Sequence, residues 1–576
     1  MRQRSSHEKA QPTYQQSLNC TESSRWRSRL LMLGFALCYA ILAGRALWVQ
    51  GVASTFYVQE GQKRYGRVEQ LLPQRGEIVD RSGKVLALNM PLAQVWVDPE
   101  EIIGVSPVMR SRLAKALGLK LTLLDRKLIE HGRFVILKNY VARENADLVS
   151  SMRLPGVHVT PQWRRFYPED EMAQIVGFVG RGGAGQEGVE LFSDAVLAGE
   201  AGVRKGIADR LGRQVEDVSV SSADDGASVC LSVDSRIQSL SSQTIRQAVQ
   251  QHRAHSGGVV VLNAHTGELL ALANWPSFDP NDRASFVRGV LRNGVVADEF
   301  EPGSTIKPIT MALALDRGVV REDTVIDASG GSMRIGSNVI HDTADHGHLN
   351  VLQILQKSSN VGMARIALKL RAQDMAGFFS NVGFGRRPDL PLPAVTAGRL
   401  RPWRRWLPVE QATMAYGYGL SISLLQLAQS YTAFANDGAF VPATLGCLPV
   451  VPTSAQIIKP ATAAAIRRAL ELTVSGGTAR QAAIEGYRVG GKTGTTRKQE
   501  GHGYAKGKYR ATFVGMAPMG NPQIIVAVMI DEPRDGAVYG GTVAAPVFAA
   551  VMKETLRLQQ ILPDRLTSSV HATVKK

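Results

Sequence analysis

Cysteine is scarce in this chain, and apolar runs long enough to cross a membrane are scarcer still. The 576 residues contain four cysteines, at positions 20, 38, 230 and 447, without the spacing of a metal site. We therefore expect neither a zinc site nor a disulfide framework, and pairing of Cys230 with Cys447 stays open. No segment is biased enough to be low-complexity and no repeat is visible, so the composition is that of an ordinary globular protein.

One apolar segment has the length of a membrane span. Residues 30–44 carry no charge, and residues 46–49 extend the run past Arg45, whose long side chain reaches the interface from a helix end. The mean hydropathy of −0.06 excludes a polytopic membrane protein. Six basic and two acidic residues give the preceding tail a charge of +4, which predicts a cytoplasmic tail and an exported remainder. A cleaved signal peptide is the alternative, but Leu37 stands where a lipoprotein needs a small residue.

The chain carries a net charge of +17, most of it outside the tail. A basic exported surface suits an anionic lipid or wall polymer. The densest basic cluster interleaves arginines with tryptophans, as nucleic-acid-binding proteins do, but export makes nucleic acid a poor partner. We interpret this cluster as a solvated loop, made of Arg399, Arg401, Trp403, Arg404, Arg405 and Trp406.

A second polar cluster holds five side chains of metal-ligating type within eight residues. Its members are His341, Asp342, Asp345, His346 and His348. Their spacing lacks the regularity of a zinc module, so a solvated loop is the preferred interpretation and a metal site the alternative.

The pattern of apolar residues predicts two folded domains or more behind the anchor. Residues 75–87 form a strand pair around a Ser-Gly turn, and the small polar run 219–227 is the candidate linker. The second domain should begin with a hairpin, continue with helices, and close with three strands and a helix. The expected ranges are 257–262 and 269–273, then 305–315 and 351–370, then 487–496, 512–517, 523–530 and 544–562. Strands on both sides of a helical middle predict an antiparallel sheet flanked by helices, an α+β architecture.

The first of three short motifs lies at a predicted helix start. Ser304-Thr305-Ile306-Lys307 follows Pro302-Gly303, which breaks the chain just before an apolar helix. Residues three apart share a helix face, so Lys307 can reach the Ser304 hydroxyl. A serine hydroxyl is hardly ionised at neutral pH, and a desolvated lysine with a lowered pKa is one base that can activate it.

The other two motifs follow in the same domain. Ser358-Ser359-Asn360 heads another helical stretch, and Lys492-Thr493-Gly494-Thr495 lies on the first of the late strands. Gly494 would let a substrate backbone approach that strand closely. Each motif alone is weak, because Ser6 to Lys9 also matches the first one. All three in order on the expected elements are a strong signal.

This set of motifs resembles the penicillin-binding protein family and, within it, the class without a glycosyltransferase domain. The Tyr416 to Gly419 run, the single anchor and the short C-terminal tail are most similar to the division-specific septal transpeptidases. Further runs look like signatures of that class: Arg75 to Ala87, Arg164 to Pro168, Glu187 to Glu190, Arg292-Asn293, Glu301 to Pro308, Lys357 to Gly362 and Asp531 to Pro533.

The resemblance implies a domain order and a location. A cytoplasmic tail (1–29) and a transmembrane anchor (30–49) precede an elongated, mixed α/β pedestal of the dimerisation type (50–222). A transpeptidase domain of the penicillin-binding and serine β-lactamase type (223–562) and a C-terminal tail (563–576) follow. The protein would cross the bacterial inner membrane once, with its catalytic domain in the periplasm.

The resemblance also implies the role of each motif. Ser304 would attack the penultimate D-alanine carbonyl with Lys307 as base, while Ser358 relays the proton to the leaving amine. Asn360 would hold the peptide amide, and Lys492 would bind the terminal carboxylate.

Thr493 and Thr495 would assist that carboxylate, and Gly494 belongs to the same substrate-binding strand. Backbone N–H groups of Ser304 and Thr495 would form the oxyanion hole. The reaction would need no metal or cofactor. Expected partners are stem peptides ending in D-Ala-D-Ala, β-lactams that acylate Ser304, and divisome membrane proteins that include a glycosyltransferase.

Several alternatives stay open. The chain has Leu392-Pro393-Ala394-Val395 where the septal group usually shows a Pro-Gly-Glu run, which suits a divergent paralogue as well. An elongation-specific transpeptidase is the nearest other enzyme, and a D,D-carboxypeptidase would usually be smaller. A class A β-lactamase would need an E-x-x-L-N run after Ser358, which is absent from the sequence. A penicillin-binding receptor or divisome scaffold without activity would not need the intact motifs.

Overall fold

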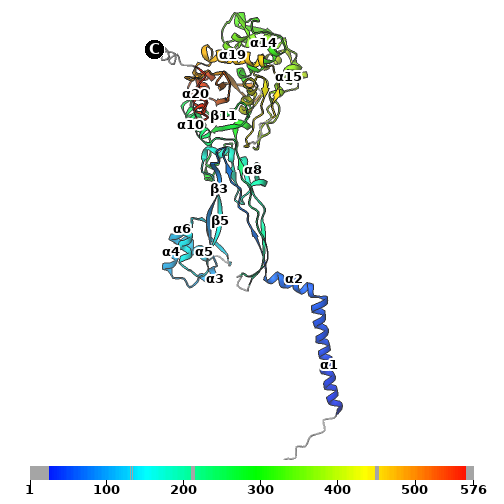
Figure 1. Cartoon of the computed structure of the whole chain (residues 1–576). Coiled ribbons are helices and arrows are strands. Elements are labelled where there is room, and N and C mark those ends of the chain that lie inside the picture. Colours follow the sequence, from blue (N-terminus) through cyan, green and yellow to red (C-terminus); the bar gives the residue numbers. More distant parts are fainter. Residues whose placement is uncertain are drawn as a thin grey trace, which may run out of the picture. The chain divides into compact units, whose positions relative to one another are not determined.

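The computed structural model describes residues 25–129, 132, 134–208, 214–287, 289–447, 453–501 and 503–565 (Figure 1). The expected tail up to residue 24, with Cys20 and the Ser6 to Lys9 match, and the C-terminal tail after residue 565 lie outside the described residues. The chain forms two compact units. The first joins the described parts of Met1–Leu72 and Ala201–Ala223, and the second joins those of Pro73–Glu200 and Asp224–Lys576.

The first unit contains the predicted anchor. Helix α1 (Arg25–Leu47) continues into a short π-helix, η1 (Trp48–Val52), and the apolar stretch Trp26–Val52 is long enough to cross a membrane. Its large apolar side chains are exposed, as those of a lipid-facing helix are. After α2 (Ser54–Tyr65), strand β1 (Gly66–Leu71) begins an antiparallel sheet of order β1-β8-β9. Its other strands come much later in the chain: β8 (Gly202–Ala208) and β9 (Gln214–Ser221).

The linker predicted at 219–227 is wrong in its first part, because residues 219–221 complete β9 and pair with β8. Asp224 then exchanges two backbone hydrogen bonds with Glu200. Gly226 packs so closely against the Leu197 carbonyl that a Cβ would lie 1.8 Å from its oxygen. The small residues of this run therefore serve close packing rather than flexibility.

The second unit begins with the predicted strand pair. Strands β2 (Ile78–Val79) and β3 (Val85–Val97) are antiparallel, and the Asp80 carboxylate accepts the backbone N–H groups of Ser82 and Lys84 in the turn. The sheet has the order β10-β2-β3-β4, with β5 also paired to β3. Strand β4 interrupts a region that shows helical spacing at both ends. The elements are α3 (Pro99–Ile102), α4 (Pro107–Leu117), α5 (Leu121–Leu128), β4 (Val135–Val141), α6 (Arg143–Ser151), β5 (Val157–Phe166), η2 (Asp170–Met172), α7 (Ala173–Val176), β6 (Phe178–Val179), β7 (Gly185–Glu187), α8 (Gly188–Phe192), α9 (Asp194–Leu197) and β10 (Val229–Cys230).

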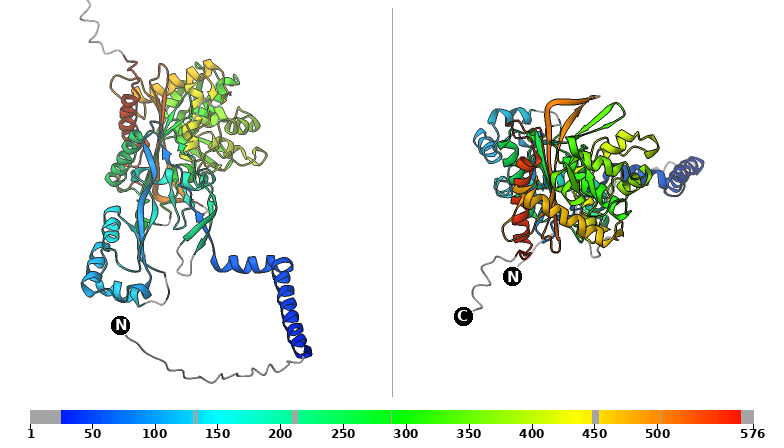
Figure 2. Two further views of the ribbon diagram at one scale, coloured as in Figure 1. Left: turned by 60° about the horizontal axis from the view of Figure 1, so that its bottom comes forward. Right: turned by 90° about the horizontal axis from the view of Figure 1, so that it is seen from above.

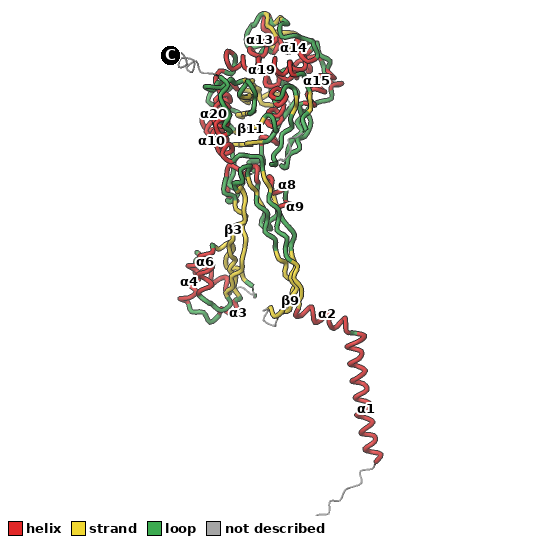
Figure 3. The backbone as a smooth tube through the Cα atoms, viewed as in Figure 1, coloured by secondary structure: helices red, strands yellow, loops and turns green. Residues whose placement is uncertain are grey.

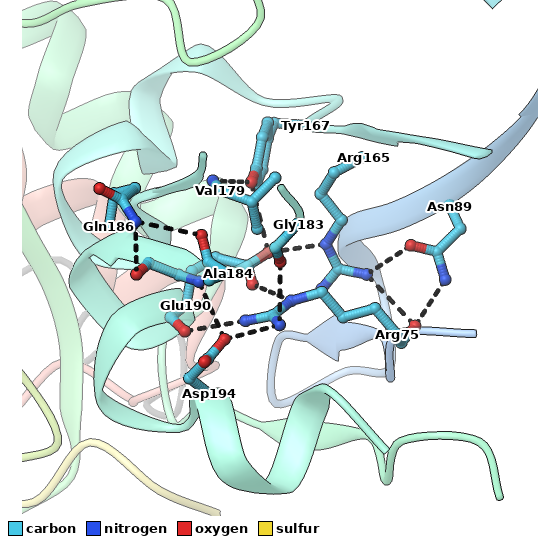
Figure 4. A network of polar contacts seen from close by, with 11 residues as sticks. Arg75, Asn89, Arg165, Tyr167, Val179, Gly183, Ala184, Gln186, Glu190 and Asp194 are labelled. Carbon is cyan, nitrogen blue, oxygen red and sulfur yellow. Dashed lines mark hydrogen bonds and ion pairs between the residues drawn. The ribbon is translucent and has the colours of Figure 1, made fainter. Parts of the chain in front are cut away.

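Three of the sequence runs singled out in this region meet in one buried network (Figure 4). The Glu190 carboxylate is fully buried and pairs with Arg75 and Arg165, in each case at 2.6 Å from Nε. Arg75 also pairs with Asp194 at 2.7 Å, and the Tyr167 hydroxyl donates to Glu190 at 3.4 Å. Because an unpaired buried charge is costly, these residues fix one another's positions.

The C-terminal part of the second unit is the predicted antiparallel sheet between helices (Figures 1 and 3). Its five strands have the order β12-β11-β21-β20-β19. Along β11, Val259 and Val261 face a core shared with α10 and α20, while Val260 and Leu262 face the larger helical layer. Both faces are covered, which explains why these strands are apolar without alternation. Figure 2 shows the red helix α20 and the green helix α10 on one side of the sheet, and the light-green to yellow helices on the other.

The elements of this part follow the sequence pattern, but several bounds differ. The helix expected at 351–370 is broken at Ser358, and the closing helix begins at Gly540 rather than at residue 544. The strands expected at 487–496 and 512–517 are Gly490–Glu500 and Gly503–Ala517. The strands are β11 (Ser256–Asn263), β12 (Leu269–Trp275), β13 (Val325–Asp327), β14 (Ser332–Ile335), β15 (Asn338–His341), β16 (His348–Asn350), β17 (Ala439–Phe440), β18 (Ala455–Gln456), β19 (Gly490–Glu500), β20 (Gly503–Ala517) and β21 (Ile524–Asp531). The longer helices are α10 (Ser235–Gln251), α12 (Lys307–Asp316), α13 (Val351–Lys357), α14 (Asn360–Ala367), α15 (Ala372–Asn381), α16 (Pro408–Met414), α17 (Leu424–Ser430), α19 (Pro460–Gly476) and α20 (Gly540–Leu558). Short helical turns are η3 (Arg283–Ser285), α11 (Gly294–Ala297), η4 (Gly303–Ile306), η6 (Trp403–Arg405), α18 (Thr432–Ala435) and η7 (Arg480–Ala482).

Two kinds of contact join the parts of the second unit. Cys230 and Cys447 form a disulfide, the pairing that the sequence left open. Tyr167 exchanges backbone hydrogen bonds with the Asn281 side chain, at 3.0 and 2.8 Å. The buried network and the sheet therefore belong to one compact unit.

Candidate active site

Ser304 lies where a 3-10 turn enters a helix, close to the predicted position. Turn η4 (Gly303–Ile306) leads directly into α12, and Pro308 occupies its first turn, where a missing N–H is tolerated. Tyr431 is fully buried, and its hydroxyl donates to the Thr305 carbonyl at 2.6 Å. This bond ties the turn that carries Ser304 to the helical layer.

Lys307 lies beside the second motif. Its side chain is fully buried, and Nζ contacts the Ser358 carbonyl, Ser358 Oγ at 3.2 Å and Asn360 Oδ1 at 2.8 Å. Burial, and then the neighbouring ammonium of Lys492, hold the pKa of Lys307 well below its usual range. A neutral lysine amine next to a serine can accept the hydroxyl proton.

Ser358 has a left-handed backbone with φ of 60°, between two helices. Ser359 follows as the N-cap of α14, with its hydroxyl accepting the Gly362 N–H at 2.9 Å. The break in the predicted helix therefore places the Ser358 hydroxyl between Lys307 and Lys492, at 3.2 and 3.0 Å from their Nζ atoms. A sparsely populated conformation held at such a point is typical of functional residues.

Asp342 is part of this site, so its assignment to a solvated loop is wrong. Its carboxylate accepts the Ser359 hydroxyl at 2.6 Å, the Val361 N–H at 3.2 Å and the Asn360 N–H. The carbonyl of His341 accepts the Asn360 side-chain amide at 2.9 Å, which turns Asn360 Oδ1 toward Lys307. Sequence patterns gave no signal for this role, because the contacts join β15 to the start of α14.

Lys492 completes the polar cluster from β19. Its side chain is fully buried, and Nζ lies 3.0 Å from Ser358 Oγ and 3.3 Å from the Thr493 carbonyl. Burial lowers the pKa of Lys492 to about 7. Strand β19 is the edge strand of the five-stranded sheet, so its outer side is available to an extended peptide.

The other residues of the third motif divide between the two faces of β19. Thr493 Oγ1 lies 3.0 Å from Thr478 Oγ1, and Thr495 Oγ1 accepts the Gly540 N–H at 3.0 Å. By strand alternation these hydroxyls lie on the face opposite to Lys492 and Gly494. Both faces border the same strand edge, where a substrate strand would lie.

Gly494 allows the turn that carries Ser304 to approach β19 closely. A Cβ at this position would lie 2.9 Å from both the Pro302 carbonyl oxygen and the Thr305 methyl group. The absence of a side chain therefore lets this turn pack against β19.

Glu301 links three segments around Ser304, a role that the sequence did not suggest. Its carboxylate accepts the Gly419 N–H at 2.8 Å and the Tyr504 hydroxyl at 3.0 Å. Burial raises the pKa of Glu301, against the lowering effect of these two donors. The carboxylate thereby holds the Tyr416 to Gly419 run and the β19–β20 hairpin beside Ser304.

A metal does not fit the cluster at residues 341–348. Within the described ranges, no group of three or more His, Cys, Asp or Glu side chains could hold a metal ion. Asp342, its most plausible ligand, is engaged with the start of α14.

Two family models match the chain. Residues 257–553 match the penicillin-binding protein transpeptidase domain, and residues 70–231 match the penicillin-binding protein dimerisation domain. Among curated proteins, the peptidoglycan D,D-transpeptidase FtsI of Escherichia coli K12 is 37% identical over 551 residues, covering 94% of this chain and 93% of its own. The probable peptidoglycan D,D-transpeptidase PenA of Neisseria gonorrhoeae is 38% identical over 550 residues, covering 94% of both.

Solved structures agree with these matches. The transpeptidase domain of penicillin-binding protein 3 from Burkholderia pseudomallei is 43% identical, with a TM-score of 0.54, over 58% of this chain and 98% of that one. Penicillin-binding protein 3 of Mycobacterium tuberculosis, solved with aztreonam, is 27% identical, with a TM-score of 0.67, over 86% of this chain and 98% of that one.

Proposed function

The chain belongs to the penicillin-binding proteins that carry a dimerisation and a transpeptidase domain, and from that premise we propose that it is a peptidoglycan D,D-transpeptidase acting through Ser304. As a member of this family it takes peptidoglycan stem peptides as substrate and binds β-lactams. The domain ranges expected from the sequence remain part of the proposal, with residues 50–222 as pedestal and 223–562 as transpeptidase domain.

One observation carries the assignment of the catalytic residues. Three contacts of 2.8–3.2 Å bring together side chains from all three motifs: Lys307, Ser358, Asn360 and Lys492. The fold does not require two buried lysines that share one serine hydroxyl, because well-packed apolar residues stabilise a core at least as well. Such a pair suits proton transfer together with binding of an anion.

Acylation follows from this arrangement. Neutral Lys307 takes the Ser304 proton, Oγ attacks the penultimate D-alanine carbonyl, and the peptide C–N bond breaks. The leaving amine receives its proton through Ser358, while Lys492 holds the carboxylate of the departing D-alanine, with Thr493 and Thr495 at the strand edge. An amine from a second stem peptide then takes the acyl group. Backbone N–H groups of Ser304 and Thr495 are the proposed oxyanion donors.

The finer biological role is septum formation. The similarity to the protein named FtsI and the Tyr416 to Gly419 run favour it over wall elongation. With α1 as an inner-membrane anchor, the catalytic residues would face the periplasm, and a divisome glycosyltransferase would supply the glycan strands. Depletion should give filaments; spherical cells would assign the protein to elongation instead.

The chemical assignment is tested with fluorescent penicillin and with a D-Ala-D-Ala peptide plus an amine acceptor. The wild type should be labelled and should form the cross-linked product, and Ser304→Ala should do neither while keeping its unfolding transition. Ser6→Ala is the matched control, because it removes the serine of the other S-x-x-K sequence in the chain. Labelling of Ser304→Ala at another residue would reject Ser304, and labelling without cross-linking would indicate a receptor.

A further inference from the structure

A cavity that the acylation step does not use lies beside the Tyr416 to Gly419 run. It has a volume of about 370 Å³, and its lining includes Tyr416, Tyr418, Tyr504, Arg401 and Glu410. The Tyr416 ring lies 6.0 Å from Lys307 Nζ, so the cavity borders the catalytic cluster.

The wall of the cavity is fixed directly to the turn that carries Ser304. Gly303 donates its N–H to the Gly417 carbonyl at 3.1 Å, and Gly417 lies between the first two tyrosines of the lining. Gly417 has a φ of +89°, and a Cβ there would lie 2.2 Å from the Gly303 carbonyl oxygen. Only a glycine permits this approach, which places the cavity one residue away from the nucleophile.

The lining has groups that can bind an anion and groups that can bind a cation. The Arg401 guanidinium pairs with Glu410 at 2.7 Å through one nitrogen, and 41% of its side chain is exposed toward solvent. A guanidinium has five N–H donors in a planar fork, so it can hold a second carboxylate alongside the first. The three tyrosine rings of the lining supply negative potential, and the Glu301 carboxylate behind Tyr504 and Gly419 adds to it.

We infer that this cavity is the subsite of the acceptor amine, and that Arg401 makes it selective for an amine whose carbon also bears a carboxylate. The inference rests on the proposed cross-linking reaction and names the acceptor class. An α-amino acid centre, as at the end of a diamino diacid side chain, meets both halves of the site. The lone ε-amine of a lysine side chain meets only the tyrosines and the carboxylates.

The transfer step is balanced without any further reactant. The acceptor ammonium loses one proton to solvent, and its nitrogen attacks the carbonyl carbon of the Ser304 ester. The new C–N bond forms, the ester bond to Oγ breaks, and the second amine proton returns to Oγ through the neighbouring lysine. Lys492 is not available for this selection, since its role is to hold the carboxylate of the donor.

The test compares two acceptors on one acyl-enzyme. The full-length protein is acylated with a thioester analogue of the donor peptide, in which a thiol leaving group replaces the terminal D-alanine, and the products with a D-amino acid and with its carboxamide are measured in competition. Both acceptors draw on the same acyl-enzyme, so their product ratio does not depend on how much acyl-enzyme forms. A charge-assisted contact to the carboxylate predicts a preference of about tenfold or more for the free acid.

Two variants of Arg401 test whether this residue causes the preference for the free acid. Arg401→Gln should lower the preference by about tenfold, and Arg401→Lys, which keeps the charge but not the fork, should retain part of it. Arg404→Gln is the matched control, because Arg404 lies three residues later, in η6, with its guanidinium 4.6 Å over the Trp403 ring and outside the cavity lining.

Equal use of the two acceptors by the wild type would overturn the inference, whatever the variants do. An unchanged preference in Arg401→Gln, or the same loss in Arg404→Gln, would also overturn it. Penicillin acylation of the wild type distinguishes failure of the proposed function from failure of the acceptor subsite. No acylation would refute the proposed function, whereas normal acylation with equal acceptor use would refute the acceptor subsite alone.

Discussion

Replacement of Lys492 by alanine tests whether its ammonium binds the carboxylate of the donor peptide. The side chain is fully buried, Nζ lies 3.0 Å from Ser358 Oγ, and burial lowers the pKa of Lys492 to about 7. An anionic substrate would favour the protonated form and receive a charge-assisted hydrogen bond, which contributes about 1.5–3 kcal/mol. At about 1.4 kcal/mol per decade of rate, Lys492→Ala should slow acylation by about 10-fold to about 150-fold.

The assay uses matched pairs of substrates. Second-order acylation rates are measured with a β-lactam or depsipeptide that carries the free carboxylate, and with its carboxamide. The carboxamide should lose much less rate in Lys492→Ala, since it never made the charged contact. Equal losses for both members of the pair would refute the carboxylate-binding role.

The pH dependence gives an independent check on the same residue. Lys492 loses its proton as the pH rises through about 7, so wild-type acylation by the carboxylate substrate should weaken above that pH. The carboxamide should not follow this decline, and Lys492→Arg, which stays charged, should remove it. Because the Lys492 charge lowers the pKa of Lys307, Lys492→Ala should also move the acid limb of the profile to higher pH.

Three further perturbations have defined outcomes. Asp342→Asn should slow penicillin acylation and move its acid limb to lower pH, because the Asp342 charge raises the pKa of Lys307; an unshifted profile would contradict this. Glu190→Ala removes the carboxylate that pairs with buried Arg165 and with Arg75, which keeps Asp194, and should lower the unfolding free energy in urea by about 3–5 kcal/mol, more than Glu190→Gln does. Replacing Cys230 and Cys447 by serine should cost about 2–4 kcal/mol, and reduction of the wild type should cost the same; a loss in only one of these measurements would argue against the disulfide.

Much of the fold could be predicted because the local signals agree with one another. The apolar runs around Val260 and Ala271 are bounded by turn residues, and they form β11 and β12 as expected. Pro302-Gly303 before an apolar stretch correctly placed Ser304 at a helix start. Such positions depend on short-range sterics and on the period of apolar residues, both of which the sequence contains.

Two elements were misplaced because backbone conformation and close packing are not visible in the local sequence. Residues on both sides of Ser358 keep helical spacing, so the break became visible only through the left-handed conformation of that serine. The small polar residues before Gly226 suggested flexibility, but they lie in β9 and against the Leu197 carbonyl. Composition alone cannot distinguish small residues that let a segment move from small residues that let it pack closely.

Asp342 shows where sequence reasoning about the active site ends. The catalytic motifs lie at the ends of elements, and a helix start or an edge strand leaves backbone donors and acceptors without partners. Polar residues must stand at those ends, so Ser304, Ser358 and Lys492 are recognisable from local context. Asp342 does equivalent work for the start of α14 from a different hairpin, and its contacts with Ser359 and Val361 exist only after β15 has folded against that helix. Within its own segment Asp342 is one of several polar residues. The local sequence therefore does not show whether it is a metal ligand, a solvated side chain or a residue that orients the site. The residues of the three motifs were therefore recognisable from the sequence, whereas the contacts that orient them required the tertiary structure.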